Sequence, residues 1–440
     1  MSIYDYESAF GTEDKTSRAM RDAIEEWFSL YYDSDATGDS DPCQRIGYTV
    51  VSKLVKTVFG EYKAACDTEF GKTVISALDP HRLQALQMML IGGECFIKPN
   101  PEPDGFSFTL IPRNNILIFQ RNALGEPTDV GLVERSTLGK HYYTLLERRT
   151  VDGEGFLTIE NRLFRSLNAQ TLGGQVNLST HPAYAQFADS YRYELPVGLG
   201  MVMLKTPILN CVDGSADGVS VYAAAAGLIR NIDRNEAQLN GEFSRGESRI
   251  VVSADLLDGQ NGLKDHLFVG LDEDPEQVGM TIFAPQLRQQ SFLERKQEYL
   301  RNVESVIGLK RGLLSDANVE ERTATEIASS AGDYNLTVMD FQRVWEEALQ
   351  KTVAMCAIFA ELYGFGIFRP GVVTVDWGNG VLYDEDKTWE AYMAMVAAGL
   401  LKPEIALGWR FNMPAETPEQ QAVIREKLMP ANTVDESAMS

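Results

Sequence analysis

Histidine and cysteine are both scarce in this chain of 440 residues, which has four histidines and five cysteines. The cysteines are odd in number and widely separated, and they form no CxxC or CxxxC pair. A zinc-type metal site and a disulfide framework are therefore both disfavoured. We interpret the cysteines as free thiols in a reducing compartment. They are Cys43, Cys66, Cys95, Cys211 and Cys356.

The sequence also lacks a long apolar run. Its most apolar segments are residues 219–229, which are short, and residues 353–368, which are interrupted by Glu361 and by glycines. A helix that spans a bilayer needs ~20 apolar residues. Residues 1–15 begin with acidic side chains and contain no apolar core of the kind that a secretion signal has. We therefore expect a soluble intracellular protein with no membrane partner.

Basic residues are too few to balance the acidic ones. The chain has 40 Lys and Arg against 63 Asp and Glu, which gives a formal net charge of −23 at pH 7. A conventional nucleic-acid-binding protein has a basic surface that attracts phosphates and releases counterions. That class is disfavoured here, although such acidity is compatible with a protein that meets DNA without holding it.

Motifs that indicate catalysis are missing. The sequence contains no GxxxxGK[ST], HExxH or GxSxG motif, and each histidine falls in a different expected element, which favours structural or surface roles. Residues 213–218 are similar to the first half of a calcium-binding loop, but Ala224 stands at the position of the closing glutamate. We interpret this segment as a turn, and we predict no enzyme activity, no metal and no cofactor.

Hydrophobic periodicity predicts an α+β protein. Residues 1–91 are expected to be helical, with apolar stripes in 16–31, 43–59 and 81–91. From Gly92 the period changes to two, and six short segments separated by turn signals predict one antiparallel meander. Residues 200–205 are expected to form a strand, and residues 372–377 a strand that rejoins this sheet.

The stretch from Asp217 to Tyr363 organises the rest of the chain. Two amphipathic helices, at 217–247 and 287–307, are predicted to enclose a small insert that contains strands. A glycine-containing break follows, and then a third helix of roughly forty residues. Shorter helices are predicted at 384–399, 403–409 and 418–428.

Four blocks of the sequence, taken in order, resemble the portal proteins of tailed bacteriophages, and specifically those of siphophages of Gram-positive hosts. The most specific block runs from ESVIGL to TATE and beyond. The four blocks are GGECFIKPNP at 92–101, LKTPILN to RIVVS at 204–253, ESVIGL to YNLTV at 304–338, and VDWGNG to AAGLL at 375–401.

The resemblance implies a phage portal fold and a ring of about twelve copies of the chain at one capsid vertex. Double-stranded DNA would pass through the ring during packaging and ejection. The ring would dock the large terminase subunit and then a head-completion adaptor, and it would contact the major capsid and scaffolding proteins. The protein would be part of the virion after assembly in the host cytoplasm.

By position, the resemblance also implies a division of the chain. The implied parts are a wing at 1–216, stem helix 1 at 217–247, a clip at 248–286, stem helix 2 at 287–308, a tunnel loop at 309–322, a long helix with a return strand at 323–383, and a small crown with a polar tail at 384–440.

Within the expected tunnel loop, Lys310 and Arg311 form the only adjacent basic pair. A few cations at the narrowest point of a channel would centre a duplex without gripping it along its length. We therefore predict that this pair lines the channel, together with Ser315 and Asn318.

Three alternatives stay open at this stage. The basic pair could instead form ion pairs with Glu304, Glu320 or Glu321. The whole chain could be an α+β soluble enzyme with an unrecognised site, which would be a compact monomer or dimer. It could also be another phage head-to-tail connector component, without an open channel.

Overall fold

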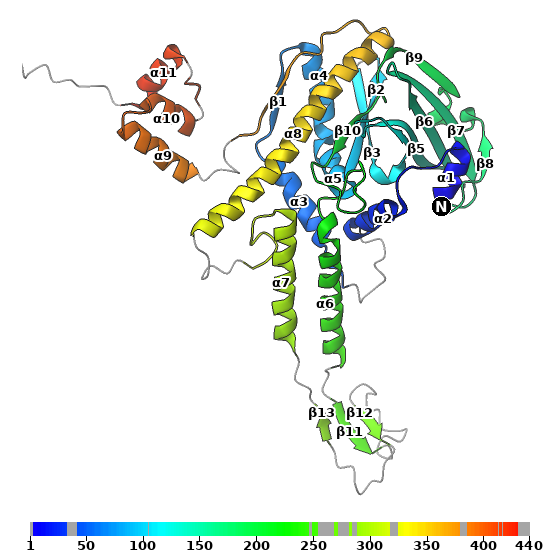
Figure 1. Cartoon of the computed structure of the whole chain (residues 1–440), viewed down its shortest axis with the longest axis horizontal. Helices are drawn as coiled ribbons and strands as arrows, with labels where there is room; N and C mark the ends of the chain where they lie inside the picture. The colour runs from blue at the N-terminus through cyan, green and yellow to red at the C-terminus, as the bar shows by residue number, and fades with distance from the viewer. Residues whose placement is uncertain are drawn as a thin grey trace, which may run out of the picture. The chain divides into compact units, whose positions relative to one another are not determined.

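The computed structural model describes residues 3–32, 42–103, 105–245, 249–253, 268–271, 281–283, 288–316, 324–378, 385–411, 413–415 and 417–429 (Figure 1). The chain divides into two compact units, Met1–Phe59 with Ala64–Val375 and Gly60–Lys63 with Asp376–Ser440. Helices and mainly antiparallel sheets occur together, which confirms the predicted α+β class.

The described residues before the first long strand form five helices, and three of these helices lie in the segments whose apolar stripes predicted them. The hydroxyl oxygen of Thr68 caps α4 by accepting a hydrogen bond from the backbone N–H of Gly71 at 3.1 Å. Gly93 ends α5 in the left-handed region, with φ of 82°. The helices are α1 (Ile3–Phe10), α2 (Arg18–Tyr32), α3 (Ile46–Val58), α4 (Glu69–Leu78) and α5 (Arg82–Gly92).

The prediction that residues 1–91 are helical throughout was wrong at one place. Residues Lys63–Cys66 form strand β1, which pairs with β14 (Val373–Asp376) in a separate two-stranded sheet. The expectation that residues 372–377 rejoin the main sheet was therefore also wrong. The pairing is supported next to β1, where the Asp67 carboxylate accepts from the N–H of Val372 at 2.7 Å and the Thr68 hydroxyl donates to the carbonyl of Pro370 at 3.1 Å.

The predicted single meander is divided between two sheets. One has the order β10-β2-β3, and the other has the order β4-β5-β6-β7-β8 with β9 paired to β7. The chain changes sheets at a short 3-10 helix, Arg113–Asn115, where the buried Arg113 side chain donates to the carbonyl of Ile116 at 2.9 Å. The strands are β2 (Glu94–Glu102), β3 (Gly105–Pro112), β4 (Ile116–Arg121), β5 (Pro127–Leu138), β6 (His141–Val151), β7 (Phe156–Ser166), β8 (Gly174–Val176), β9 (Ser190–Pro196) and β10 (Val202–Lys205).

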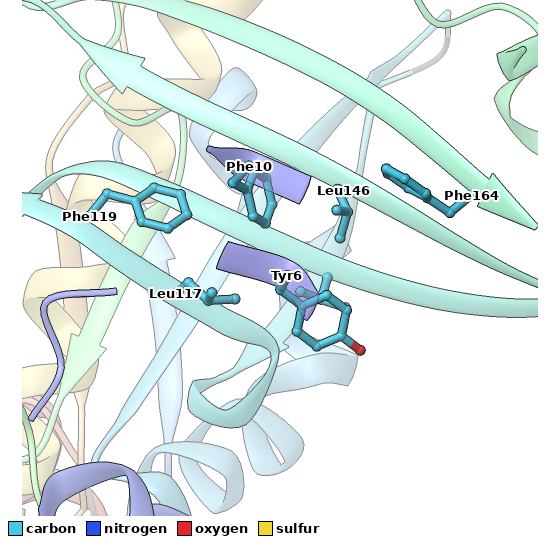
Figure 2. Packing of buried hydrophobic residues seen from close by; sticks show 7 residues of the cluster. Tyr6, Phe10, Leu117, Phe119, Leu146 and Phe164 are labelled. Atoms are coloured by element: carbon cyan, nitrogen blue, oxygen red, sulfur yellow. The ribbon is translucent and has the colours of Figure 1, made fainter. Parts of the chain in front are cut away.

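Helix α1 packs against the six-stranded sheet through aromatic side chains (Figure 2). The rings of Phe10 and Phe119 meet edge to face, with their centroids 5.2 Å apart. Gly131 on β5 makes room for them, because a Cβ there would lie 2.7 Å from the Phe10 ring. The core cluster consists of Tyr6, Phe10, Leu117, Phe119, Val133, Leu146 and Phe164.

Three further helices carry the part of the chain that the sequence singled out (Figure 1). They are α6 (Ala226–Arg245), α7 (Gln289–Ile307) and α8 (Ala324–Leu362). Helices α6 and α7 lie side by side, and we call this pair the hairpin. Between them lie β11 (Arg249–Ser253), β12 (Phe268–Leu271) and β13 (Thr281–Phe283), in which β11 pairs parallel with β12 and antiparallel with β13.

Helix α6 begins later than the sequence predicted, at Ala226 rather than near Asp217, after a 3-10 turn at Ala223–Ala225. The preceding backbone is held by the body instead of by helical hydrogen bonds. The N–H of Val221 and the hydroxyl of Ser220 both donate to the carbonyl of Leu90, at 2.9 and 3.0 Å. Tertiary partners thus override the local helical pattern here.

The second unit contains the three short helices predicted near the C-terminal end, α9 (Glu385–Ala397), α10 (Pro403–Arg410) and α11 (Pro418–Leu428). The Nε of Arg425 on α11 donates to the buried Glu404 on α10 at 2.7 Å. The rings of Tyr392 and Trp409 join α9 to α10, with their centroids 5.0 Å apart. Of the helices in the described parts of the chain, none is both long enough and apolar enough to cross a bilayer.

A buried ion cluster joins the two large sheets. Glu147 on β6 bonds to Lys98 on β2 at 2.7 Å and to Arg149 at 2.5 Å, and Arg149 also donates to the carbonyl of Leu199 at 2.7 Å. Burial alone would raise the pKa of Glu147, but the charges and hydrogen bonds of Arg149 and Lys98 lower it from 4.5 to about 2.

Replacing Glu147 with Gln should therefore destabilise the protein at neutral pH by ~3–5 kcal/mol, because the buried Arg149 and the partly buried Lys98 lose their counter-charge. The stability that the lowered pKa contributes is fully present above pH 4.5 and is lost as the pH falls from 4.5 toward about 2. The variant should lack this part of the pH dependence. Urea unfolding followed by tryptophan fluorescence measures both effects, with Glu154→Gln in an exposed turn as the control. Equal stability of the two variants would contradict this account.

Candidate functional site

Two glycines allow the segment before the hairpin to lie directly on the body. A Cβ on Gly93 would lie 2.3 Å from the carbonyl carbon of Gly218, and a Cβ on Gly218 would lie 2.3 Å from the carbonyl oxygen of Gly93. Real Cβ atoms do not approach backbone this closely, so neither position admits a side chain in this arrangement. The N–H of Gly218 donates to the carboxylate of Glu94 at 2.8 Å.

A buried cluster of four charged side chains surrounds this backbone contact, and we call it the root cluster. It consists of Glu94, Arg113, Arg121 and Asp217. Arg113 lies 3.2 Å from both carboxylates, and Arg121 lies 3.5 Å from Glu94 and also bonds to Asp217. The hydroxyl of Thr16 accepts from Arg113 at 2.8 Å. With two positive and two negative groups, the cluster has no formal net charge.

The turn predicted at residues 213–218 is confirmed, but Asp217 has a role that the sequence did not reveal. Asp213 accepts hydrogen bonds from the N–H of Ser215 at 3.0 Å and from the hydroxyl of Ser17. Burial alone would raise the pKa of Asp213, but these hydrogen bonds more than offset that effect and lower it. Asp217 instead belongs to the root cluster, where it contacts Arg113 from the 3-10 turn and Arg121 from the end of β4.

The two helices of the hairpin contact each other through a mixture of apolar and paired polar groups. The amide nitrogen of Asn235 donates to the carbonyl of Phe292 at 3.1 Å, and Lys296 pairs with Glu236 at 3.1 Å. Lys296 also donates to the side chain of Gln44 at 2.6 Å, which ties α7 to the residues before α3. The buried apolar side chains of the pair include Ile229, Ile232, Leu239, Leu300, Val303 and Ile307.

The faces of α6 and α7 opposite their buried stripes are exposed and differ in charge. The face of α6 carries Arg230 and Arg234, and we call it the positive face. The face of α7 carries Glu294 and Glu298, and we call it the negative face. Residues four apart lie on the same side of a helix, so each pair forms a stripe. Arg230 also pairs with Glu26 of α2 at 2.9 Å.

The loop after α7 is folded against the hairpin. Gly308 ends the helix in the left-handed region with φ of 77°, and Leu309 is buried. The N–H of Leu313 donates to the carbonyl of Lys310 at 3.1 Å, which closes a four-residue turn. Gly312 has φ of 85° at the third position of this turn, as a type II turn requires.

The carboxylate of Glu304 holds the far side of this loop. Glu304 is 0% exposed, and its oxygens accept from the N–H groups of Gly312, Leu314 and Ser315 at 3.2, 2.5 and 2.9 Å. The hydroxyl of Ser315 adds a fourth bond at 2.8 Å. Sequence reasoning considered Glu304 only as a partner for the basic pair. The signal that was available is its position in the apolar stripe of α7, between Val303 and Ile307.

The predicted channel residues fall in different environments. Lys310 and Arg311 are exposed at the turn. Ser315 is buried, with its hydroxyl on Glu304, so within the chain its side chain supports the loop. Asn318 lies outside the described residues, as do Glu320 and Glu321 of the alternative reading. That these residues line a channel stays a prediction.

Within the described ranges, no group of three or more His, Cys, Asp or Glu side chains is arranged to hold a metal ion. The acidic and basic groups of the root cluster form ion pairs with one another, and backbone hydrogen bonds join Glu94 to the N–H of Gly218 and Arg113 to the carbonyl of Ile116. They position chain segments, and they have no arrangement of nucleophile and base that would indicate a reaction.

A family model described as "Phage portal protein, SPP1 Gp6-like" matches residues 206–427, which is half of the chain. The matched range includes the hairpin, the loop after it and α8. A search of the curated proteins found no match. Among solved structures, one described as "Neck of native GTA particle computed with C12 symmetry" is similar to this chain with a TM-score of 0.48 and 13% sequence identity. That match covers 92% of this chain and 98% of the other.

Replacing Gly218 with Ala should prevent the hairpin from seating on the body, because the new Cβ would overlap the backbone at Gly93. We expect a loss of at least ~3 kcal/mol of stability, at the severe end for single substitutions. Gly174→Ala is the matched control, since a Cβ there meets nothing within 4 Å. Thermal unfolding of the two variants decides the point, and similar melting temperatures would show that the close approach is not required.

Proposed function

The chain belongs to the SPP1 Gp6-like family of phage portal proteins, and we propose from this membership that its copies close into a ring of about twelve subunits around a channel for double-stranded DNA. A portal or head-to-tail connector role follows from the family itself. The observation that carries the finer proposal is the hairpin, which is seated on the body at one end, interrupted by an insert and followed by an exposed basic turn.

The parts of the chain then take the following roles. The wing is residues 1–216, the two stem helices are 217–247 and 287–308, and the clip is 248–286. The tunnel loop is 309–322, residues 323–383 form the long helix and the return strand, and residues 384–440 form the crown and tail. The structure supports a later beginning for the first stem helix, at Ala226.

The charge of the chain suits a conduit. Duplex DNA carries one negative charge per ~1.7 Å of its axis, so a basic channel would hold it through many released counterions and would resist its movement. A chain with a formal charge of −23 avoids that grip. Basic groups confined to one turn, Lys310 and Arg311, would centre the duplex at a single level.

The proposed partners follow from this role. The clip would dock the large terminase subunit during packaging and a head-completion adaptor afterwards, and the wing would contact the major capsid and scaffolding proteins. The protein would reside at the portal vertex of the virion after assembly in the host cytoplasm. Family membership supports a structural role rather than a catalytic one.

The hairpin offers two complementary faces for ring closure. Each subunit of a ring contacts its neighbours through two different faces, because one rotation relates all the copies. Rotation preserves height along the axis, so in a hairpin that runs along the axis residues at the same level meet. Glu236 pairs with Lys296 within the hairpin, which places Arg234 and Glu298 at one level. The positive face of one copy would therefore meet the negative face of the next.

Arg295 lies beside the negative face and carries the opposite charge. Its side chain lies over the ring of Tyr299, 5.3 Å from the centroid, and its Nε donates to the Tyr299 hydroxyl at 2.9 Å. This contact directs the guanidinium along α7 toward Tyr299, so the carboxylates of Glu294 and Glu298 lie on this face beside the positive charges of Arg295 and Arg301.

The purified protein should form closed rings with an axial hole. Negative-stain imaging shows the hole, and light scattering gives the mass. A species near the chain mass of 48.9 kDa under assembly conditions would contradict the proposed function.

Reversing one charge of the proposed interface should weaken ring assembly, and reversing both should restore it. Arg234→Glu and Glu298→Arg each place like charges at every interface, where an exposed pair is worth up to ~1 kcal/mol. The double variant recreates an opposite pair. The ring fraction from sedimentation, measured as a function of salt concentration, tests the restoration. Single variants that assemble like the wild type would remove these faces from the interface.

Replacing Lys310 and Arg311 together with Ala should leave rings intact but change DNA packaging or retention, because the turn is proposed to touch the duplex and not the subunit core. The length of packaged DNA and its resistance to nuclease are the measurements. Lys140→Ala, in an exposed turn between β5 and β6, is the control. Unchanged length and retention would show that the pair has no role in the channel.

A further inference from the structure

We propose that Glu304 is a positioning residue that closes the loop after α7 on itself and holds Lys310 and Arg311 on a rigid, outward-facing turn. This inference rests on the proposed function, because it concerns how the basic turn meets DNA. It goes further by assigning the geometry of that turn to one buried carboxylate at the end of the hairpin.

Glu304 holds both ends of the loop at once. Its backbone carbonyl accepts from the N–H groups of Gly308 and Leu309, the latter at 2.8 Å, where the chain leaves α7. Its carboxylate accepts from Gly312, Leu314 and Ser315, where the chain returns. Residues 308–315 therefore form a closed loop whose two ends are fixed to a single residue.

The two basic side chains lie at the part of this loop that Glu304 does not cover. Leu309 is buried on one side of them and Ser315 on the other, while Lys310 and Arg311 are exposed. The hydrogen bond between residues 310 and 313 fixes the turn itself. The backbone is thus held on both sides of the pair.

Three neighbouring elements brace the closed loop. Lys53 on α3 donates to the carbonyl of Leu313. The N–H of Asp316 donates to the side chain of Gln297 on α7 at 2.8 Å. The hydroxyl of Thr337 on α8 lies 3.5 Å from the carbonyl of Gly308. The loop is therefore fixed to α3 of the body, to α7 of the hairpin and to α8.

The hydrogen bonds of Glu304 argue against the alternative in which its carboxylate forms ion pairs with Lys310 and Arg311. Both carboxylate oxygens of Glu304 accept from the backbone and hydroxyl donors of residues 312–315. The carboxylate is 0% exposed, whereas the basic pair is at the surface. Glu304 therefore positions the pair by holding the backbone of the loop, and its negative charge is balanced by the hydrogen-bond donors of residues 312–315.

Different replacements of Glu304 and its partner should remove different numbers of the hydrogen bonds that close the loop. In Glu304→Gln one oxygen becomes an NH2 group, which cannot accept from the N–H of Gly312, while the other oxygen keeps its two bonds. In Glu304→Asp the charge stays but the shorter side chain no longer reaches the loop. Ser315→Ala removes only the hydroxyl bond. Glu361→Gln, at an exposed position near the end of α8, is the matched control.

Hydrogen exchange of assembled rings, followed by mass spectrometry on peptides that cover residues 305–316, tests the clamp. We expect exchange in this segment to be about tenfold faster in Glu304→Gln and faster still in Glu304→Asp, since hydrogen bonds to a charged group are lost. Ser315→Ala should show a smaller increase, and Glu361→Gln should match the wild type. Unchanged exchange in both Glu304 variants would overturn the inference, and the Ser315 variant keeps the test possible if a Glu304 variant fails to assemble.

DNA retention separates a positioning role from a merely structural one. Glu304→Gln rings should show a defect of the same kind as Lys310→Ala/Arg311→Ala rings. If the loop exchanges faster while retention stays normal, and the double alanine variant is defective, the positioning role is wrong and the proposed function stands. If the double alanine variant is itself normal, the channel contact in the proposed function fails, whatever the exchange data show.

Discussion

The root cluster is the constraint on which the placement of the hairpin depends. Burying four charges costs several kcal/mol for each ion unless every group is paired and hydrogen-bonded. Here Glu94 and Asp217 each contact both arginines, and Glu94 also accepts from the backbone of Gly218. Breaking the seating would leave these buried charges without their partners, so the cluster favours the observed seating of the hairpin on the body.

The hairpin is thus fixed at both of its connections to the body by a buried carboxylate that accepts from backbone N–H groups. Glu94 does this before α6 and Glu304 does it after α7. Glu94 directly follows Gly93, which ends α5, and Glu304 lies in the last turn of α7, which Gly308 ends. At both connections a buried carboxylate near a left-handed glycine accepts hydrogen bonds from the backbone of the connecting segment.

Local patterns in the sequence were enough to predict the helices and most strands, because an apolar stripe is a property of neighbouring residues. They failed where the partner is distant. Strand β1 needs β14, which lies about 300 residues away in sequence, and the start of α6 is decided by Leu90 and Glu94. In the candidate site the exposed basic pair could be found from sequence, but the role of Glu304 required knowing which backbone groups surround it.

The packing of α6 on α7 has a further consequence for assemblies built on the two charged faces. Both faces belong to the hairpin. The angle between them is fixed by contacts between α6 and α7, such as the hydrogen bond from the buried Asn235 to the carbonyl of Phe292. The same angle, repeated from copy to copy, sets the curvature of the assembly. In a ring closed through these faces, a substitution at Asn235 that changes the packing of α6 on α7 would change this curvature.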